Sequence, residues 1–289
     1  MAALASVALR LPTLSRLPLT WDGVQYVLGV LHYDLALHEP HPPGYYLYVM
    51  SAWAMHLLGI APHVALLVVT LAASAVMTWV IVFWVGRMAG NWAAIGAGAL
   101  SVFSPLCWAA AIDPNTYAVA GMLAAVVGWL SWRAWRESGW WPALSGVALG
   151  FAAGFRPTTA LFMAPLWVWC VFSGGPRRGL TGVAALAVAT ATWALPFLLT
   201  VGGPAQYWEI SGRLGGGVLG LAPVSGNFAR FGIHLKSLFI GTGSLLLLGW
   251  LFVPRALGNE FSRSRVFLGL WLVPALTFFV LIHTANPRY

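Results

Sequence analysis

The stretch that decides the fold is HVALLVVTLAASAVMTWVIVFWVG, residues 63–86. It contains no Asp, Glu, Lys or Arg, and it is longer than the roughly 20 apolar residues that a helix needs to cross a bilayer. Comparable apolar runs recur along the chain, whereas strands of a membrane barrel would alternate apolar and polar residues over about 10 positions. The sequence therefore predicts an all-α, polytopic integral membrane protein.

The composition supports this class. Of the 289 residues, 60% are hydrophobic and only 8% are charged, whereas soluble globular domains carry about 25% charged residues. Further spans are predicted at 92–111, 115–135, 140–155, 157–174, 180–201, 234–254 and 266–285. This pattern predicts about 8 to 9 transmembrane helices, together with juxtamembrane helices in the first external loop.

The whole chain, residues 1–289, is predicted to form a single transmembrane module. Its parts are an external loop with juxtamembrane helices at 10–62, a transmembrane bundle at 63–201, a mobile external loop at 202–233, and the last transmembrane helices at 234–289. The opening segment MAALASVALRLP is too short to span a bilayer and lacks the charged region of a signal peptide. We therefore expect a fragment that begins inside or after a first spanning helix.

The basic residues predict the orientation in the membrane. The net charge is +8, but the 15 Lys and Arg residues are scattered singly or in pairs, which indicates membrane topology rather than nucleic-acid binding. If a short helix at about 44–58 lies flat on the membrane, one side collects Arg87, Arg133, Arg136, Arg177, Arg178, Arg255, Arg263 and Arg265, as cytoplasmic loops do. If that helix crosses instead, Asp113 falls on the face opposite Asp22. We adopt the flat arrangement, which puts both acids on the external side.

The most polar segment is WDGVQYVLGVLHYDLALHEPHPPGYYLY, residues 21–48. It holds three of the seven carboxylates and three of the seven histidines. Acids and imidazoles gathered beside a bilayer indicate chemistry or binding, because a scaffold loop needs few polar residues. We expect this segment to converge with the tip at 113–117, the break at 156–158 and the terminal residues 286–289. A carboxylate beside guanidinium groups suits transfer from a lipid phosphate, since it can deprotonate a hydroxyl while the cations neutralise the leaving phosphate.

Each of these residues also has a simpler explanation. Asp22 and Asp113 either act in the site or cap the helices that follow them. Asp34 is either an acid or polar ligand or part of a solvated helix face. Arg156 either contacts an anion or snorkels to the membrane surface. The histidine pair His38 and His41 is expected to pack and hydrogen-bond rather than bind a metal, because HxxH alone is a weak metal signal.

These residues resemble a known family. A Trp-Asp pair followed by Tyr26, HPPGYYLY at 41–48, and an acidic tip after two spans are similar to the amino-terminal module of the GT-C membrane glycosyltransferases. The similarity is to the protein O-mannosyltransferase and aminoarabinose-transferase type, including bacterial relatives with an HPPGYPLY signature. The resemblance implies a polyprenyl-phosphate-linked sugar donor and an active site on the extracytoplasmic face.

The resemblance also implies roles for individual residues. Asp22 matches a first-loop aspartate that acts as the catalytic base or positions the acceptor, and Asp113 matches the acid of the second external loop. Arg156 matches a basic residue that faces the donor phosphate, while His41 begins the second juxtamembrane helix. Because Gly23 follows Asp22 where many relatives carry a second acid, a divalent metal is not supported, and no cofactor is predicted.

We therefore predict an inverting membrane glycosyltransferase of the bacterial inner membrane, with a protein, lipid or glycan as acceptor. The predicted site residues are Asp22 and Asp113 as catalytic groups, Arg156 and Arg288 for the donor phosphate, and Tyr26, Asp34, His41 and Tyr117 for the substrate. The alternative is a transporter or flippase of a lipid-linked or anionic solute. Transporters place charged residues near the bilayer midplane, commonly in paired repeats. The acids here lie at membrane edges and no duplicated half is apparent, which favours the enzyme.

Overall fold

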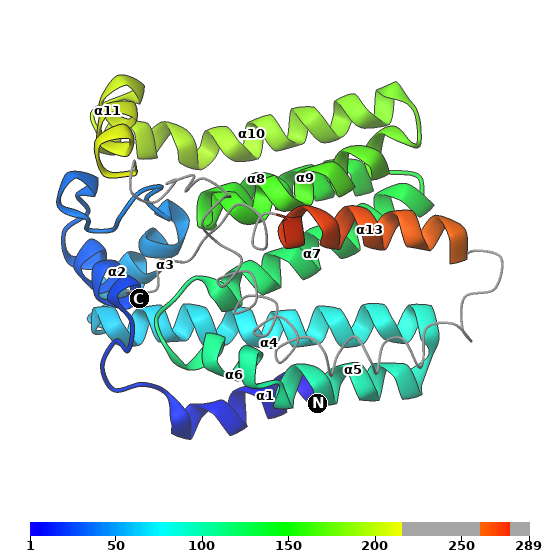
Figure 1. Ribbon diagram of the computed structural model, residues 1–289, viewed down its shortest axis with the longest axis horizontal. Coiled ribbons are helices and arrows are strands. Elements are labelled where there is room, and N and C mark those ends of the chain that lie inside the picture. Colours follow the sequence, from blue (N-terminus) through cyan, green and yellow to red (C-terminus); the bar gives the residue numbers. More distant parts are fainter. Residues whose placement is uncertain (216–260, 278–289) are drawn as a thin grey trace, which may run out of the picture. The chain divides into compact units, whose positions relative to one another are not determined.

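The computed structural model describes residues 1–215 and 261–277, and within these ranges every regular element is a helix (Figure 1). The α-helices are α1 (Ala2–Arg10), α2 (Trp21–Leu31), α3 (Tyr46–His56), α4 (Pro62–Ala89), α5 (Asn91–Phe103), α6 (Pro105–Ile112), α7 (Tyr117–Arg136), α8 (Trp141–Phe155), α9 (Pro157–Phe172), α10 (Pro176–Thr200), α11 (Pro204–Gly215) and α13 (Phe261–Thr277). Two short 3-10 helices, η1 (Leu11–Thr13) and η2 (Leu35–Leu37), complete the set. The chain divides into two units, Met1–Leu214 and Gly215–Tyr289, and the site described below belongs to the first.

Three of the described helices, α4, α7 and α10, are long and apolar enough to cross a membrane. The pair α5 and α6 makes a fourth if its 52° bend interrupts a single span. Helices α8 and α9 are apolar but shorter, with 15 and 16 residues. The all-helical membrane fold is therefore confirmed, while the number of 8 to 9 crossings stays a prediction, because the segment at 234–254 lies outside the described residues.

The predicted span at 92–111 is not one straight helix. It breaks at Ser104-Pro105, because proline lacks the N–H needed inside a helix and is favoured in a first turn, where that group would have no partner. The hydroxyl of Ser104 accepts a hydrogen bond from the N–H of Cys107 at 3.5 Å and caps α6. The break separates two helices that share one apolar run.

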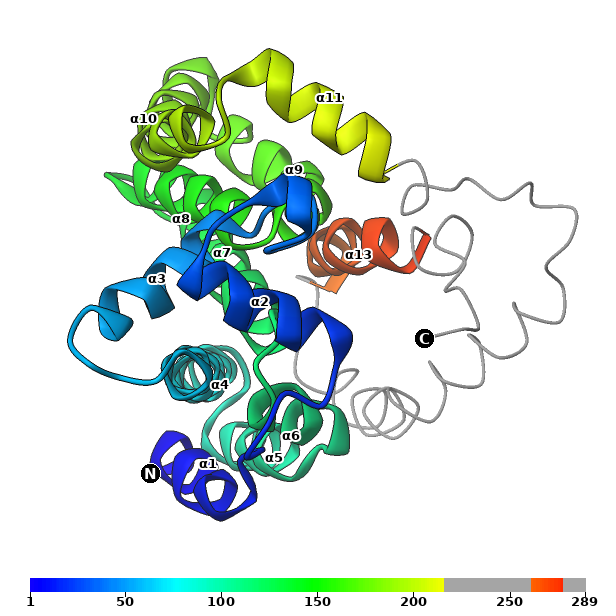
Figure 2. The same cartoon turned by 90° about the vertical axis from the view of Figure 1, so that its left-hand side faces the viewer.

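Three short helices, α2, α3 and α11, lie at one end of the bundle (Figures 1 and 2). Helix α3 has 11 residues, which at a rise of about 1.5 Å per residue is too short to cross a bilayer. Helix α2 packs against α3 and α4, and α3 also packs against α8. This arrangement suits the flat, non-crossing position that the charge pattern predicts.

Helix α11 corrects the prediction that residues 202–233 begin as a mobile loop. Its apolar face, formed by Tyr207 and Ile210, packs against Phe197 and Val201 at the end of α10, and this burial stabilises a helix at Pro204–Gly215. Its polar face borders a pocket of about 480 Å³, which Gln206, Glu209, Arg213 and Ala36 line together with Gly202, Ala205 and Ile210. This pocket includes none of the predicted site residues.

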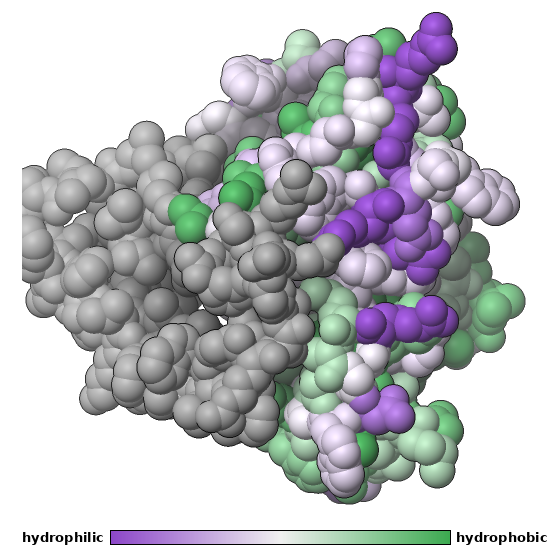
Figure 3. Space-filling model, turned by 90° about the vertical axis from the view of Figure 1, so that its right-hand side faces the viewer, coloured by the Kyte–Doolittle hydropathy of each residue, from purple (hydrophilic) through white to green (hydrophobic). Residues whose placement is uncertain are grey.

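The opposite end of the bundle carries arginines that the charge pattern assigns to the cytoplasm. They lie in the last turns of α4 and α7 and at the start of α10, at Arg87, Arg133, Arg136, Arg177 and Arg178. Hydrophilic side chains gather among apolar ones on this end of the molecule (Figure 3). The guanidinium of Arg178 donates hydrogen bonds to the carbonyl oxygens of Ala134 and Glu137, which joins α10 to the end of α7.

A buried arginine, Arg10, was not singled out by the sequence analysis. Its guanidinium donates hydrogen bonds to the hydroxyl of Ser74 at 2.5 Å and to the carbonyl oxygens of Ser101 and Val102 at 2.8 and 3.2 Å. Both terminal nitrogens of the guanidinium thus have partners, which offsets part of the cost of burying a cation, while the buried Nε has none. Arg10 therefore joins α1 to α4 and to the end of α5, beside the break in the bent span.

Glycines bring α8 into close contact with α10. A Cβ added at Gly146 would collide with the carbonyl oxygen of Gly182, and one at Gly150 would lie 2.9 Å from the Cβ of Ala189. Gly154 continues the same four-residue spacing, which is typical of closely packed membrane helices. Because α8 ends at the junction that carries Arg156, this packing fixes the position of one predicted site residue.

Substitution of Gly146 by alanine tests this packing. We expect Gly146→Ala to lower the free energy of unfolding by about 1–3 kcal/mol, because the added methyl group meets backbone that must move. Thermal unfolding of the purified protein measures the change. Gly96→Ala in α5 is the matched control, since within the described residues a Cβ at this position meets no atom within 4 Å. Equal unfolding temperatures for the two variants would contradict the close packing.

Candidate active site

Asp113, which follows α6, is a buried carboxylate that holds the segment before α2. Its oxygen Oδ1 accepts hydrogen bonds from the N–H of Leu19 at 2.8 Å and from the hydroxyl of Ser15 at 3.4 Å. Oδ2 accepts one from the hydroxyl of Thr20 at 3.0 Å. The alternative that Asp113 caps the next helix is wrong, because Asn115 supplies the side-chain oxygen that accepts a hydrogen bond in the first turn of α7.

Asp22 is a half-buried acid in the first turn of α2. It does not cap that helix, because Thr20 is the N-cap and its hydroxyl oxygen accepts a hydrogen bond from the N–H of Gly23 at 3.1 Å. The capping explanation of Asp22 is therefore wrong. Within the described parts of the chain, no residue forms a hydrogen bond or ion pair with its carboxylate.

Thr20 connects these two acids. Its hydroxyl donates to Asp113 and accepts from the first turn of α2. The same turn packs directly on the tip that follows Asp113, because a Cβ added at Gly23 would lie 3.1 Å from the carbonyl oxygen of Pro114. Asp113 thus fixes the start of α2, and the start of α2 fixes Asp22.

A cluster of aromatic rings joins α2 to the start of α3. Tyr26, one turn beyond Asp22, is fully buried, and its ring centroid lies 5.8 Å from that of His41, 5.3 Å from Tyr45 and 5.2 Å from Tyr48. The rings of His41 and Tyr45 are 5.1 Å apart. Edge contacts of this kind stabilise packing beyond the buried area alone. These contacts pack the two halves of the polar segment 21–48 against each other.

Arg156 occupies the junction between α8 and α9. Its Nε donates a hydrogen bond to the hydroxyl of Thr158 at 3.3 Å, and its Nη1 donates to the hydroxyl of Thr116. The guanidinium carbon lies 4.7 Å from the ring centroid of Tyr117 and 6.0 Å from that of Tyr45, within the range of cation–π attraction. Among the described residues no acid forms an ion pair with Arg156. Its positive charge therefore stays available to an anion.

These groups lie close enough together to influence one another electrostatically. Burial lowers the pKa of His41, while the Asp22 carboxylate raises it and the Arg156 guanidinium lowers it. Burial also raises the pKa of Tyr26 and that of Tyr45, and both phenols are influenced by Asp22 and Arg156 as well. At neutral pH the imidazole and the two phenols are therefore uncharged. Their surroundings then contain one carboxylate, Asp22, and one guanidinium, Arg156, neither of which forms an ion pair with a described residue.

An apolar pocket of about 210 Å³ adjoins this cluster. Tyr45 and Pro157 line it next to Arg156, and Gly154, Trp193, Phe197 and Tyr207 belong to its wall. The indole N–H of Trp193 donates a hydrogen bond to the carbonyl oxygen of Gly150 at 2.9 Å, which holds the tryptophan against α8. Arg156, which forms no ion pair among the described residues, thus lies next to an apolar pocket.

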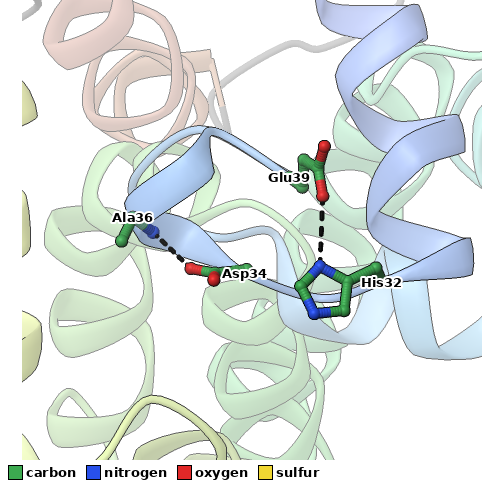
Figure 4. A network of polar contacts seen from close by, with 4 residues as sticks. All are labelled: His32, Asp34, Ala36 and Glu39. Carbon is green, nitrogen blue, oxygen red and sulfur yellow. Dashed lines mark hydrogen bonds and ion pairs between the residues drawn. The ribbon is translucent and has the colours of Figure 1, made fainter.

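Asp34 lies in a separate turn (Figure 4). Its N–H and C=O exchange hydrogen bonds with the backbone of Glu39, and its Oδ1 accepts a hydrogen bond from the N–H of Ala36 at 2.7 Å. Glu39 also contacts Nδ1 of His32 at 3.2 Å. Asp34 therefore caps the short helix η2 rather than standing on a solvated helix face, and its substrate role stays a prediction.

The structure brings together five of the predicted residues, namely Asp22, Tyr26, His41, Tyr117 and Arg156. Asp113 bonds instead to the segment before α2. Arg288 lies outside the described residues. The sequence analysis missed Thr20, although a threonine directly before a predicted helix is a common N-cap signal. Within residues 1–215 and 261–277, no three His, Cys, Asp or Glu side chains gather closely enough to hold a metal ion.

Comparison with protein families defines the class of protein. The family model described as dolichyl-phosphate-mannose-protein mannosyltransferase matches residues 40–203, which is more than half of the chain. The fold and this match define a membrane glycosyltransferase of the GT-C type. The chain belongs to the dolichyl-phosphate-mannose-protein mannosyltransferase family. No curated protein and no solved structure matches the chain.

The link between Asp113 and Thr20 can be tested by substitution. We expect Asp113→Asn and Thr20→Val each to lower the free energy of unfolding by about 1–3 kcal/mol. The first removes the charge that strengthens three accepted hydrogen bonds, and the second leaves Oδ2 of the buried Asp113 without its partner. Thermal unfolding in detergent measures this loss. Thr181→Val, at an exposed threonine of α10, is the control and should unfold like the wild type. Wild-type stability of both Asp113→Asn and Thr20→Val would contradict the link.

Proposed function

We propose that the protein transfers a sugar from a polyprenyl-phosphate-linked donor to an acceptor hydroxyl on the extracytoplasmic face, with inversion at the anomeric carbon. The observation that carries this proposal is that Asp22 and Arg156 both lie near enough to His41 to influence it, while neither forms an ion pair among the described residues. Each charged group is thus free to act on a different part of the reaction. Membership of the mannosyltransferase family supports mannose as the first sugar to test.

The apolar pocket beside Arg156 supports a lipid-linked donor. A phosphate placed at the guanidinium would receive charge-assisted hydrogen bonds, and the adjoining apolar walls would accommodate the first carbons of the lipid. Tyr117, which is 55% exposed and faces the guanidinium, would line the sugar side of the donor. Arg288 is proposed as a second contact to the phosphate from the resemblance alone.

The reaction is proposed as a single displacement. The Asp22 carboxylate takes the proton of the acceptor hydroxyl as its oxygen forms a bond to the anomeric carbon. The bond between that carbon and the phosphate oxygen breaks, and its electron pair leaves with the lipid phosphate. Arg156 stabilises the negative charge that develops there. In this mechanism Asp113 acts by positioning Asp22, because its own carboxylate already accepts three hydrogen bonds.

The location of the site supports an extracytoplasmic reaction. The cluster lies at the end of the bundle that is opposite the arginines of α4, α7 and α10, and basic loops mark the cytoplasmic side. If the protein lies in a bacterial inner membrane, the reaction would take place at the periplasmic face of that membrane. A transporter would instead need its charged residues near the bilayer midplane. The end position of Asp22 and Arg156 therefore favours the enzyme.

The proposed role of Asp22 can be tested by transfer assays. Purified protein in lipid nanodiscs is incubated with polyprenyl-phosphate mannose, then with other polyprenyl-phosphate sugars, and a panel of peptide, lipid and glycan acceptors, and released polyprenyl phosphate is measured. Asp22→Asn should lower the transfer rate by about 10² to 10⁴, the usual contribution of a general base. Its unfolding temperature should stay unchanged, because the described residues offer this carboxylate no bond to lose.

Glu137→Gln is the matched control, since it makes the same change of carboxylate to amide at the opposite end of the bundle. It should retain wild-type turnover. Wild-type turnover of Asp22→Asn would overturn the catalytic assignment, and absence of lipid phosphate release by the wild type with every donor would overturn the proposed reaction.

A further inference from the structure

Gln25 is a buried amide on the face of α2 that carries the site. It is 5% exposed, and it lies one turn beyond Asp22 and next to Tyr26. Its Oε1 lies 2.5 Å from Nδ1 of His41. Buried amides require hydrogen-bond partners, and this contact supplies one across the two halves of the polar segment. The residue lies outside the family match at 40–203, and it is not among the residues that the sequence predicted for the site.

The contact with Gln25 determines which nitrogen of His41 carries the proton. An amide oxygen only accepts hydrogen bonds, so Nδ1 must donate, and in the neutral ring Nε2 then holds the free lone pair. None of the described residues forms a hydrogen bond with Nε2. The ring cannot turn freely, because the rings of Tyr26 and Tyr45 pack against it.

A glycine in α2 lets the loop reach Gln25. A Cβ added at Gly29 would lie 2.9 Å from Cδ of Pro40, the residue directly before His41. Helix α2 and the backbone of this loop are thus in contact at Gly29. This contact positions the imidazole of His41 beside Gln25, which lies one helical turn before Gly29. The geometry depends on two buried backbone segments rather than on mobile side chains.

The surroundings of His41 keep its ring neutral. The titratable or charged groups that face it are Asp22 and Tyr26 from α2, His38 from the preceding turn, Tyr45 from the start of α3 and Arg156 from the α8–α9 junction. Burial lowers the pKa of His41 from its ordinary value, with Asp22 acting in the opposite direction. The lone pair of Nε2 is therefore available at neutral pH.

We propose that Gln25 is a positioning residue that holds His41 with its proton on Nδ1, so that Nε2 accepts a hydrogen bond from a substrate hydroxyl in the site of Asp22 and Arg156. This inference rests on the proposed transfer reaction. The hydroxyl belongs either to the donor sugar or to the acceptor, and measurements of binding and turnover distinguish these two sources.

Nitrogen NMR tests the tautomer without any substrate. The wild-type protein is labelled with ¹⁵N at its histidine rings, and the His41 signals are assigned by their loss in His41→Gln. At pH 7.5 we expect the signals of a neutral ring with the proton on Nδ1, and we expect Gln25→Met to lose this preference. A ring with its proton on Nε2, or a charged ring, would overturn the proposal and leave the proposed reaction untouched.

Binding and turnover then identify the hydroxyl. If it belongs to the sugar, Gln25→Met should bind polyprenyl-phosphate mannose about tenfold more weakly and polyprenyl phosphate equally well, a loss that corresponds to one hydrogen bond. If it belongs to the acceptor, both lipids should bind normally and turnover should fall about tenfold. Gln206→Met, at an exposed glutamine of α11, is the matched control. Unchanged binding and turnover in Gln25→Met would overturn the proposal.

Gln25→Glu keeps an oxygen acceptor at the same position. It therefore distinguishes loss of the hydrogen bond to His41 from a general disturbance of the structure. It should retain the Nδ1 proton and more turnover than Gln25→Met. Its carboxylate also stabilises the charged imidazole, so the pKa of His41 rises and the acidic limb of the pH–rate profile moves to higher pH. A profile that coincides with that of the wild type would contradict the contact between residue 25 and His41.

Discussion

The hydrogen bonds of the buried Asp113 carboxylate are the contacts on which the position of the site depends. They hold Leu19 and Thr20 at the start of α2, and Thr20 passes the constraint to the first turn of that helix. Asp22 lies in this turn and has no partner of its own among the described residues. One acid is thus fully bonded and the other is free. The first stabilises the local fold, and the second has the unbonded carboxylate that the proposed general base requires.

The same division of roles applies to the cations. Arg10 is buried and donates to Ser74 and to the carbonyl oxygens at the end of α5, so its guanidinium joins α1 to α4 and α5. Among the described residues, the Arg156 guanidinium donates only to threonine hydroxyls and contacts aromatic rings, and no acid there neutralises its charge. The glycine contacts between α8 and α10 hold this arginine in place at the edge of an apolar pocket. Residue type alone does not separate these roles, whereas hydrogen-bond partners do.

Much of the fold and part of the site could be predicted from the sequence. The long apolar runs predict α4, α7 and α10, because burial of an apolar helix in a bilayer depends on composition and length. The motif at 41–48 and the Arg156-Pro157 break predict groups that the structure brings together. The bend at Pro105 and the helix after Pro204 were missed, since each depends on tertiary packing as well as on a proline that can begin a helix. The roles of Asp113 and Gln25 could not be predicted, because their partners lie far away in the sequence and no local pattern identifies them.

We propose that Asp22 and Arg156 belong to one site, in which Arg156 attracts a lipid phosphate and Asp22 repels it. The most direct test is the affinity of the purified protein for polyprenyl phosphate, measured by calorimetry in nanodiscs. We expect Arg156→Gln to weaken binding about 10- to 100-fold, since a charge-assisted hydrogen bond contributes about 1.5–3 kcal/mol. We expect Asp22→Asn to bind at least as tightly as the wild type, because it removes a negative charge near the phosphate. Unchanged binding by Arg156→Gln, or equal weakening by both substitutions, would contradict the shared site.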